Sequence, residues 1–229
     1  MLYYITDRRQ FPGSEAEQRA ALLRKIAEAA RCGVDYIQLR EKDLTARELL
    51  ELAKEAAAAI RNAAPKHPKT GIQKLETLLL INSRLDVALA CGADGVHLRS
   101  DDISAAEARA VWMKAAPNLG LGTHDCVIAA SCHTAGEVRR AESEGADFVV
   151  FAPVFEKGGE RGVGLEALRA ACRGMPEASP AVNLPVLALG GVTLDNARAC
   201  LEAGSAGIAG IRLFQDNDVA EVVARLRGR

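Results

Sequence analysis

The chain has 229 residues and a net charge of −1, with 49% of the residues apolar and 26% charged. We expect one α/β domain over residues 1–229, since this length allows a substantial core. Disordered chains, nucleic-acid-binding surfaces and membrane-surface proteins each require a charge bias that is missing here, so we expect no nucleic-acid and no membrane partner. No run of 18 apolar residues and no secretory leader pattern occurs, which predicts a cytoplasmic protein.

Short, continuous apolar runs recur along the chain, as expected for strands that are covered on both faces. They lie at 2–6, 36–40, 78–82, 95–98, 127–131, 148–152, 186–189 and 207–211. Between them, Ala-, Glu-, Arg- and Leu-rich stretches have helical spacing. These predict helices at 15–31, 45–63, 84–91, 104–115, 135–144, 165–173, 194–203 and 218–228. Thr45 and Ser104 are placed to cap two of them.

A repeated signature joins helix ends to strands. RCGVDYIQL, ACGADGVHL, SEGADFVVF and EAGSAGIAGI each place a glycine at a helix end, followed directly by a strand. Alternation of eight strands with eight helices in a chain of this length predicts a (β/α)8 TIM barrel. A doubly wound open sheet is the alternative, but it requires a Gly-rich first turn, and ITDRRQFPG is not one.

Two segments are longer than such a barrel needs, at 61–77 and 174–183, and we interpret both as additions to its amino-terminal face. The six cysteines show no CxxC pair and no zinc-type spacing with histidine, which predicts reduced thiols. Cys132 and His133 are adjacent, but neighbouring strand residues point to opposite faces. We therefore expect no nucleophilic cysteine.

Function in such barrels lies at the carboxyl ends of the strands. The cations expected there are Arg40, Lys42, Arg99, Lys157, Arg161 and Arg212. Surface loops carry charges in any barrel, but a set on several strands indicates a highly charged anion such as a diphosphate. The Gly190–Gly191 turn before VTLDNARA exposes backbone N–H groups, which suits a phosphate. We thus expect small-molecule phosphate and diphosphate substrates.

Four other residues at these strand ends are candidates for metal binding or proton transfer. Asp101 and Asp102 could bind Mg²⁺, although Asp101 could equally serve the turn into the next helix. His133, just beyond a strand, is an acid/base candidate. His97 has apolar neighbours and is interpreted as a packed residue.

The segment IQLREKD (37–43) ends in four consecutive charges. Strand alternation predicts that Gln38, Arg40 and Lys42 project together toward the active end. Glu41 and Asp43 should then face helices or solvent.

The motifs YYITD, IQLREKD, LLINSRLDVALACGADGVHL, SCHTAGEVRRAESEGADFVVFAPVFEK, LALGGV and AGSAGIAGI together resemble the thiamine phosphate synthase/thiazole tautomerase superfamily. The resemblance is collinear over nearly the whole chain. It implies a transferase that joins hydroxymethylpyrimidine diphosphate to a thiazole phosphate and releases pyrophosphate with the help of Mg²⁺. It also implies, for this chain, the diphosphate-binding residues Gln38, Arg40 and Lys42, with Asn82, Asp102 as a Mg²⁺ ligand, Ser131, the loop residue Lys157 and the phosphate-binding Gly191.

The chain departs from the synthase pattern at three sites. Ser83 stands where synthases usually have a metal-binding Asp, Arg99–Ser100 replaces a Gly-Gln pair, and Arg212 replaces a Ser. The loop EKGGERGVGLE is closer to the tautomerase pattern. The alternatives are therefore a metal-free thiazole tautomerase that uses His133, and a non-catalytic regulator that binds a thiamine precursor. The sequence leaves open whether the chain forms a homo-oligomer.

Overall fold

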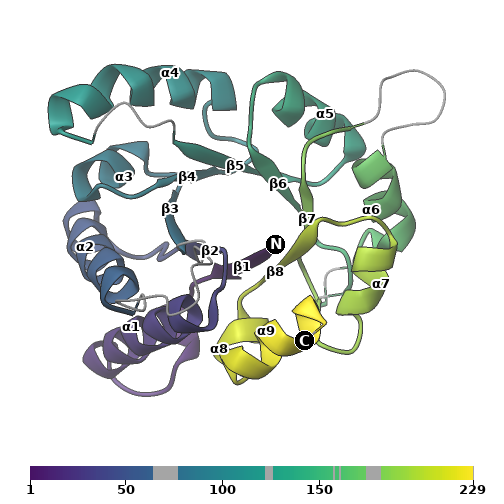
Figure 1. The fold of residues 1–229 in the computed structure, drawn as a ribbon, viewed down its shortest axis with the longest axis horizontal. Coiled ribbons are helices and arrows are strands. Elements are labelled where there is room, and N and C mark those ends of the chain that lie inside the picture. Colours follow the sequence, from purple (N-terminus) through teal and green to yellow (C-terminus); the bar gives the residue numbers. More distant parts are fainter. Residues whose placement is uncertain (64–76, 122–125, 157, 160, 174–181, 229) are drawn as a thin grey trace, which may run out of the picture.

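Parallel strands form a closed barrel in the computed structural model, which describes residues 1–63, 77–121, 126–156, 158–159, 161–173 and 182–228. Neighbours around the barrel follow the order of the chain, and β8 pairs with β1 (Figure 1). The strands are β1 Leu2–Ile5, β2 Tyr36–Leu39, β3 Leu78–Asn82, β4 Gly95–Leu98, β5 Val127–Cys132, β6 Phe148–Phe151, β7 Val186–Ala188 and β8 Gly207–Gly210.

Helices surround the barrel and cover its outer face (Figure 1). They are α1 Glu15–Cys32, α2 Ala46–Ala63, α3 Leu85–Cys91, α4 Ala105–Ala115, α5 Ala135–Ser143, α6 Gly164–Arg173, α7 Ala197–Glu202, α8 Arg212–Gln215 and α9 Val219–Arg227, with 3₁₀ turns η1 Arg8–Gln10 and η2 Ala116–Leu119. Ser104 caps α4 through a reciprocal pair of hydrogen bonds with Glu107. Thr45 and Glu48 form the same pair before α2, so both predicted caps are confirmed.

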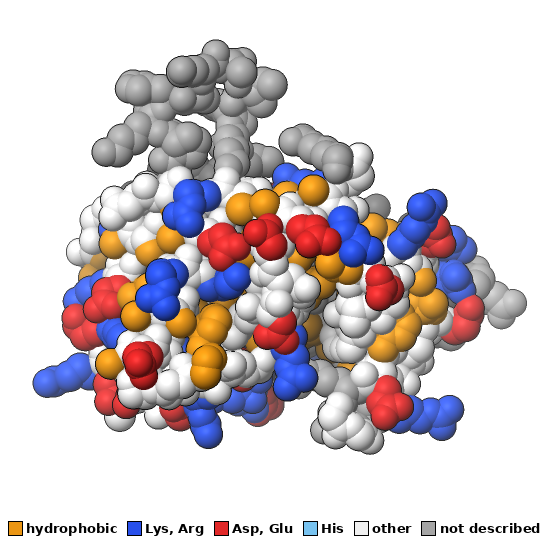
Figure 2. All heavy atoms as spheres, turned by 90° about the horizontal axis from the view of Figure 1, so that it is seen from below, with side chains coloured by type: hydrophobic (Ala, Val, Ile, Leu, Met, Phe, Trp, Pro, Cys, Tyr) orange, Lys and Arg blue, Asp and Glu red, His pale blue; other side chains and the backbone are white. Residues whose placement is uncertain are grey.

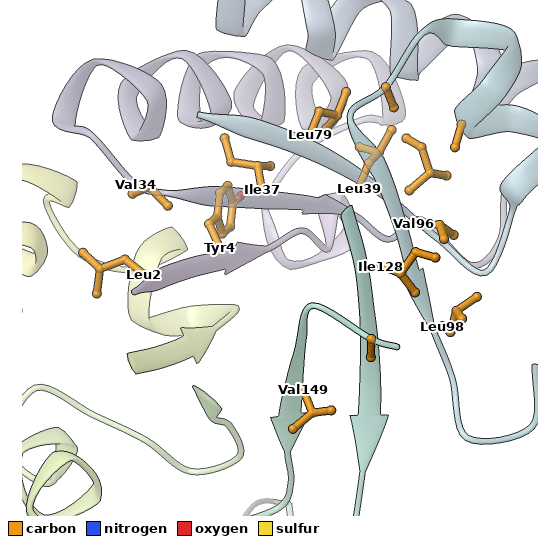
Figure 3. Close-up of a cluster of buried hydrophobic side chains, with 14 of the residues drawn as sticks. Leu2, Tyr4, Val34, Ile37, Leu39, Leu79, Val96, Leu98, Ile128 and Val149 are labelled. Carbon is orange, nitrogen blue, oxygen red and sulfur yellow. The ribbon is translucent and has the colours of Figure 1, made fainter. Parts of the chain in front are cut away.

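The apolar core has two layers. Inside the barrel, side chains from alternating strand positions fill the interior, among them Tyr3, Leu80, Phe148 and Leu187. The larger cluster lies between the strands and the helices, where Ile37, Val96 and Ile128 project outward (Figure 3). Because both faces of each strand are buried, the strand sequences are continuously apolar rather than alternating.

The predicted barrel is confirmed, including all of the predicted strands to within one residue at each end. Three short helical elements were not predicted, namely η1, η2 and α8. Arg212 lies two residues beyond β8, as predicted, but the chain already turns into α8 at that residue. Most of the predicted insertions at 61–77 and 174–183 lies outside the described residues.

Acidic and basic side chains are interspersed on the face shown in Figure 2, with small apolar areas between them. This mixture agrees with the near-neutral net charge. None of the described helices is long and apolar enough to cross a membrane.

Candidate active site

Inward-facing polar side chains occupy the carboxyl ends of β2 to β5. The strand register aligns Gln38 with Leu80, and Asn82 with His97. Ser131 lies two residues beyond Ala129, which pairs with His97, so its side chain points to the same interior. These four polar residues replace the apolar filling found lower in the barrel and form the floor of a site.

A chain of hydrogen bonds connects this floor. Gln38 Nε2 donates to the Tyr3 hydroxyl at 2.9 Å, and that hydroxyl lies 3.1 Å from His97 Nδ1. His97 Nε2 in turn lies 2.8 Å from Ser131 Oγ. Burial, with a further contribution from Arg40, lowers the pKa of His97 to about 3, and burial raises the pKa of Tyr3. His97 is therefore neutral, and the interpretation of His97 as a packed residue was incomplete.

Three cations gather above the floor. Burial lowers the pKa of Arg40, with Arg99 adding to the effect, and the neighbouring Arg40 lowers the pKa of Lys42, with partial burial and Arg99 contributing. Arg40 and Lys42 each have a pKa lowered by neighbouring cations, which indicates that Arg40, Lys42 and Arg99 lie close to one another. Asp7 partly offsets this lowering. A cluster of positive charges of this kind creates a positive potential that attracts anions.

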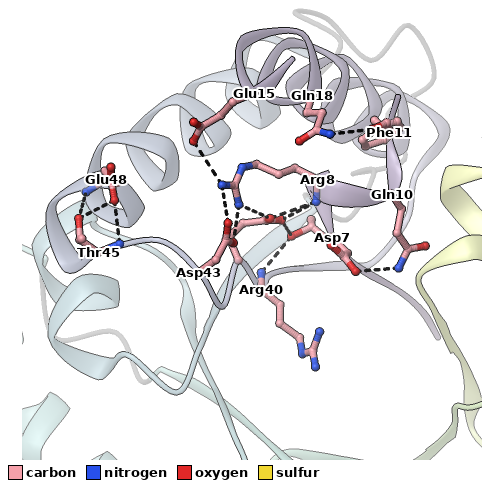
Figure 4. Close-up of polar contacts among 12 residues, drawn as sticks. Asp7, Arg8, Gln10, Phe11, Glu15, Gln18, Arg40, Asp43, Thr45 and Glu48 are labelled. Carbon is pink, nitrogen blue, oxygen red and sulfur yellow. Dashed lines mark hydrogen bonds and ion pairs between the residues drawn. The ribbon is translucent and has the colours of Figure 1, made fainter. Parts of the chain in front are cut away.

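The carboxylates of the segment 37–43 point away from these cations. Glu41 and Asp43 both bind Arg8, at 3.1 Å and 2.7 Å from its Nη1 atom. Figure 4 shows the Arg40 side chain pointing away from Arg8 and Asp43. The prediction that the cations and the carboxylates of this segment point in different directions is thus confirmed for Arg40. Glu41, however, is only 5% exposed and faces the buried Arg8 rather than solvent.

Thr6 links the two groups of charges. Its hydroxyl donates to Glu41 Oε1 at 2.6 Å and accepts from the backbone N–H of Arg40 at 2.9 Å. The Arg8 backbone N–H also donates to Glu41. The loop after β2 is therefore fixed to the end of β1 on both sides of Arg40, which places its side chain at the site.

The acidic residues of the site do not form a complete metal centre. Among the described residues, no group of three His, Cys, Asp or Glu side chains is placed to hold a metal ion. Asp102 Oδ2 accepts from the backbone N–H of Arg99 at 2.7 Å, and Asp101 pairs with the Arg99 guanidinium. Ser83 has φ = 59°, in the left-handed region, and its hydroxyl accepts from Asn82 Nδ2 at 3.2 Å.

The Gly190–Gly191 turn packs tightly against the loop that follows β6. Both glycines have positive φ, and a Cβ atom on Gly191 would lie 2.6 Å from the Glu156 carbonyl oxygen. The Phe155 N–H donates to the Gly190 carbonyl at 2.9 Å, and Asn196 donates to that of Gly191 at 3.0 Å. In the part of the chain that the structure describes, the N–H groups of Gly191 and Val192 donate to no backbone carbonyl. Successive backbone N–H groups in turns of this kind are donors that phosphate-binding sites use.

The remaining candidates lie at other strand ends. His133 is exposed, and its Nδ1 donates to the Ala152 carbonyl at 2.7 Å. Its neighbour Cys132 is buried and points to the opposite face, as predicted. Arg212 is exposed at the first residue of α8. Lys157 lies outside the described residues.

Tyr3, Thr6 and Arg8 are the residues of the site region that the sequence interpretation missed. Strand alternation could have found Tyr3, because it shares the inward face of β1 with Ile5. No local signal identifies Arg8, whose partners Glu41 and Asp43 are more than 30 residues away.

Replacing Arg99 with glutamine should move the alkaline decline of pyrophosphate binding to higher pH. Lys42 binds an anion while it is protonated, and this charge is lost as the pH rises through its lowered pKa. Removing the Arg99 charge lets that pKa return toward its ordinary value. Calorimetric titration of inorganic pyrophosphate across a pH series measures the shift, and affinity at neutral pH should fall about fivefold or less. Arg99→Lys, which keeps the charge, should leave the profile in place; an unchanged profile in Arg99→Gln contradicts the cluster.

The chain is a (β/α)8-barrel protein whose clustered cations and glycine turn lie at the carboxyl ends of the strands. The model of the family described as thiamine monophosphate synthase matches residues 2–214. The chain belongs to this family.

Three relatives illustrate the similarity. The chain is 37% identical to "Putative thiamine-phosphate synthase 2" of Aquifex aeolicus, over 93% of this chain and 96% of the relative. It is 36% identical to the thiamine-phosphate synthase of Methanoculleus marisnigri, over 100% of this chain and 94% of the relative. Among solved structures, the thiamine phosphate pyrophosphorylase from Pyrococcus furiosus superimposes with a TM-score of 0.72 at 32% identity, covering 99% of this chain and 93% of that one.

Proposed function

We propose that this chain is a thiamine-phosphate synthase, which condenses hydroxymethylpyrimidine diphosphate with thiazole phosphate and releases pyrophosphate. The observation that carries the proposal is the cluster of Arg40, Lys42 and Arg99, of which Arg40 lies close enough to His97 to lower its pKa. The membership of the family and the names of the relatives supply the substrates. Cys91, Cys132, Cys172 and Cys200 are free thiols, which suits a reducing compartment, and we propose the cytoplasm.

The cations act on the leaving group. When the C–O bond to the diphosphate breaks, negative charge builds on the departing oxygen. Arg40 and Lys42, held in place by the loop after β2, stabilise this charge more in the transition state than in the ground state. Their arrangement precedes binding, so little reorganisation is needed during the reaction.

The other strand ends hold the two substrates. Gln38, Asn82 and Ser131 present amide and hydroxyl groups to the pyrimidine substrate. Gly190, Gly191 and Arg212 receive the phosphate of the thiazole. The resemblance to the family assigns Lys157, which lies outside the described residues, to the diphosphate. His133 lies beside this loop through its contact with Ala152.

The donor set fits Mg²⁺ that arrives with the diphosphate, but not a metal site formed by the protein alone. Mg²⁺ is commonly held by one or two carboxylates together with substrate phosphates and water. Here Asp102 would supply the carboxylate, while Ser83 supplies none and Asp101 is paired with Arg99. The ion, when bound, would neutralise phosphate charge beside the three cations.

Purified protein supplied with both substrates and Mg²⁺ should form thiamine phosphate, and Ser83→Asp should form it at lower Mg²⁺. The positive φ of Ser83 is tolerated by Asp and Asn better than by most residues, so the backbone need not change. The added carboxylate should lower the half-saturating Mg²⁺ concentration about tenfold, equivalent to ~1.4 kcal/mol.

Ser83→Asn is the matched control, because it has the same shape without the charge and should not improve Mg²⁺ use. Absence of product from both the wild type and Ser83→Asp contradicts the synthase proposal. Incubation with the thiazole substrate alone tests the tautomerase alternative, which the exposed His133 favours. We expect no isomerised thiazole from that incubation.

A further inference from the structure

We propose that Tyr3 and His97 form a one-way hydrogen-bond relay that fixes the Ser131 hydroxyl as a hydrogen-bond donor toward the substrate. Neither relay residue touches the substrate, so both are positioning residues. The inference rests on the proposed function only for the identity of the group that Ser131 contacts. The direction of the relay follows from the protein's own contacts.

The direction is set at Gln38. Its Nε2 amide group can only donate, and it donates to the Tyr3 oxygen at 2.9 Å. The single tyrosine proton is then free for the other neighbour, His97 Nδ1, at 3.1 Å. Burial of the phenol raises its pKa, so this proton stays on the oxygen. His97 Nδ1 is therefore an acceptor.

The proton on His97 is consequently on the other nitrogen. A neutral imidazole carries one N–H, and the buried ring beside Arg40 does not take up a second proton near neutral pH. Nε2–H therefore donates to Ser131 Oγ at 2.8 Å. Ser131 has no acceptor for its own proton in the part of the chain that the structure describes, and its partly buried side chain lies at the carboxyl end of β5. The hydroxyl thus presents its proton to the site.

This tautomer excludes a nucleophilic role for Ser131. A serine activated by histidine needs an unprotonated nitrogen facing its hydroxyl, and usually a carboxylate on the opposite nitrogen. Here the nitrogen that faces Ser131 carries the proton, and a tyrosine hydroxyl stands in the carboxylate position. The same arrangement suits a donor aimed at an anionic or leaving oxygen.

Packing holds the relay in register. The Tyr3 ring contacts the rings of Tyr36 and Phe148 edge to face, with centroids 6.0 Å and 5.3 Å away. It also lies 5.8 Å from the His97 ring. Tyr3 is completely buried, so its hydroxyl cannot turn toward solvent and exchange its partners for water.

The tautomer can be read directly by NMR from the ring nitrogens of ¹⁵N-histidine-labelled full-length protein. The chain has four histidines, and the His97 signals are assigned by their loss in His97→Gln. We expect protonated Nε2 and unprotonated Nδ1 in the wild type, and loss of that preference in Tyr3→Phe. A wild type with protonated Nδ1, or with a cationic ring at neutral pH, overturns the proposal.

Kinetics tests the consequence of the relay. Tyr3→Phe should lower kcat about tenfold with a smaller change in KM, because Ser131 then loses its fixed orientation. In a Ser131→Ala background the same change should have little further effect, since there is no proton left to orient. An equal loss in both backgrounds overturns the proposal and indicates a structural role for the phenol.

Tyr36→Phe is the matched control. It removes a hydroxyl from a ring in the same cluster, but this hydroxyl takes no part in the chain of hydrogen bonds, so the tautomer and kcat should be unchanged. A wild type that makes no thiamine phosphate contradicts the proposed function, whereas the NMR result still decides the relay.

Discussion

Replacing Gly191 with alanine is expected to raise the KM for the thiazole phosphate about 100-fold, which corresponds to ~2.7 kcal/mol. The added Cβ would lie 2.6 Å from the Glu156 carbonyl oxygen and 2.8 Å from Phe155 Cβ, at a residue with φ = 63°. The Gly190–Gly191 turn must therefore move away from the loop after β6, and its N–H groups then no longer point toward the phosphate. Steady-state kinetics with each substrate varied in turn measures the effect.

Gly145→Ala controls for the backbone conformation alone. Gly145 has φ = 80°, and a Cβ atom there meets nothing within 4 Å. This variant should lose about 1 kcal/mol of stability and keep its KM values. If Gly191→Ala and Gly145→Ala have a similar KM for the thiazole phosphate, the Gly190–Gly191 turn is not the binding site for that phosphate.

Replacing Arg8 with methionine should destabilise the fold by about 3–5 kcal/mol, because it leaves a buried carboxylate without its positively charged partner. The side chains of Arg8 and Glu41 are only 5% and 1% exposed. Arg8 also makes two hydrogen bonds to the Asp43 carboxylate, which raise the pKa of the guanidinium and keep it charged. Urea denaturation measures the free energy of unfolding.

Arg19→Met is the matched control, because Arg19 pairs with Glu55 on the surface, with side chains 31% and 50% exposed. Arg19→Met should lower the free energy of unfolding by less than about 1 kcal/mol. Adding Glu41→Gln to Arg8→Met should recover part of the loss, since the unpaired charge is then gone. Equal losses in the free energy of unfolding for Arg8→Met and Arg19→Met contradict a stabilising role for the buried contacts of Arg8 with Glu41 and Asp43.

The barrel could be predicted because its strands are short apolar runs and its helices end at glycines, both of which are local patterns. Gly33 and Gly92, for example, are left-handed helix ends at the predicted positions. The short α8 could not be predicted, because four residues are too few for a helical period to show.

The site was only partly predictable for a different reason. Arg40 follows from its place at a strand end, whereas the roles of His97 and Arg8 depend on residues from other strands. Apolar neighbours indicate a packed His97, and only the closure of the barrel brings Tyr3 and Ser131 to its two nitrogens. The positive φ of Ser83 likewise has no signal in the sequence.

The buried carboxylate of Glu41 has an electrostatic consequence for the cation cluster. Gathering Arg40, Lys42 and Arg99 is unfavourable by itself, because like charges repel. Asp7 and Glu41 both raise the pKa of Arg40, against burial and Arg99. The fold thus carries built-in counter-ions behind the cations, and these compensate their repulsion before any diphosphate arrives. The cations that bind the leaving diphosphate are thus preorganised in the free protein. None of the binding energy of the diphosphate is then needed to bring these cations together.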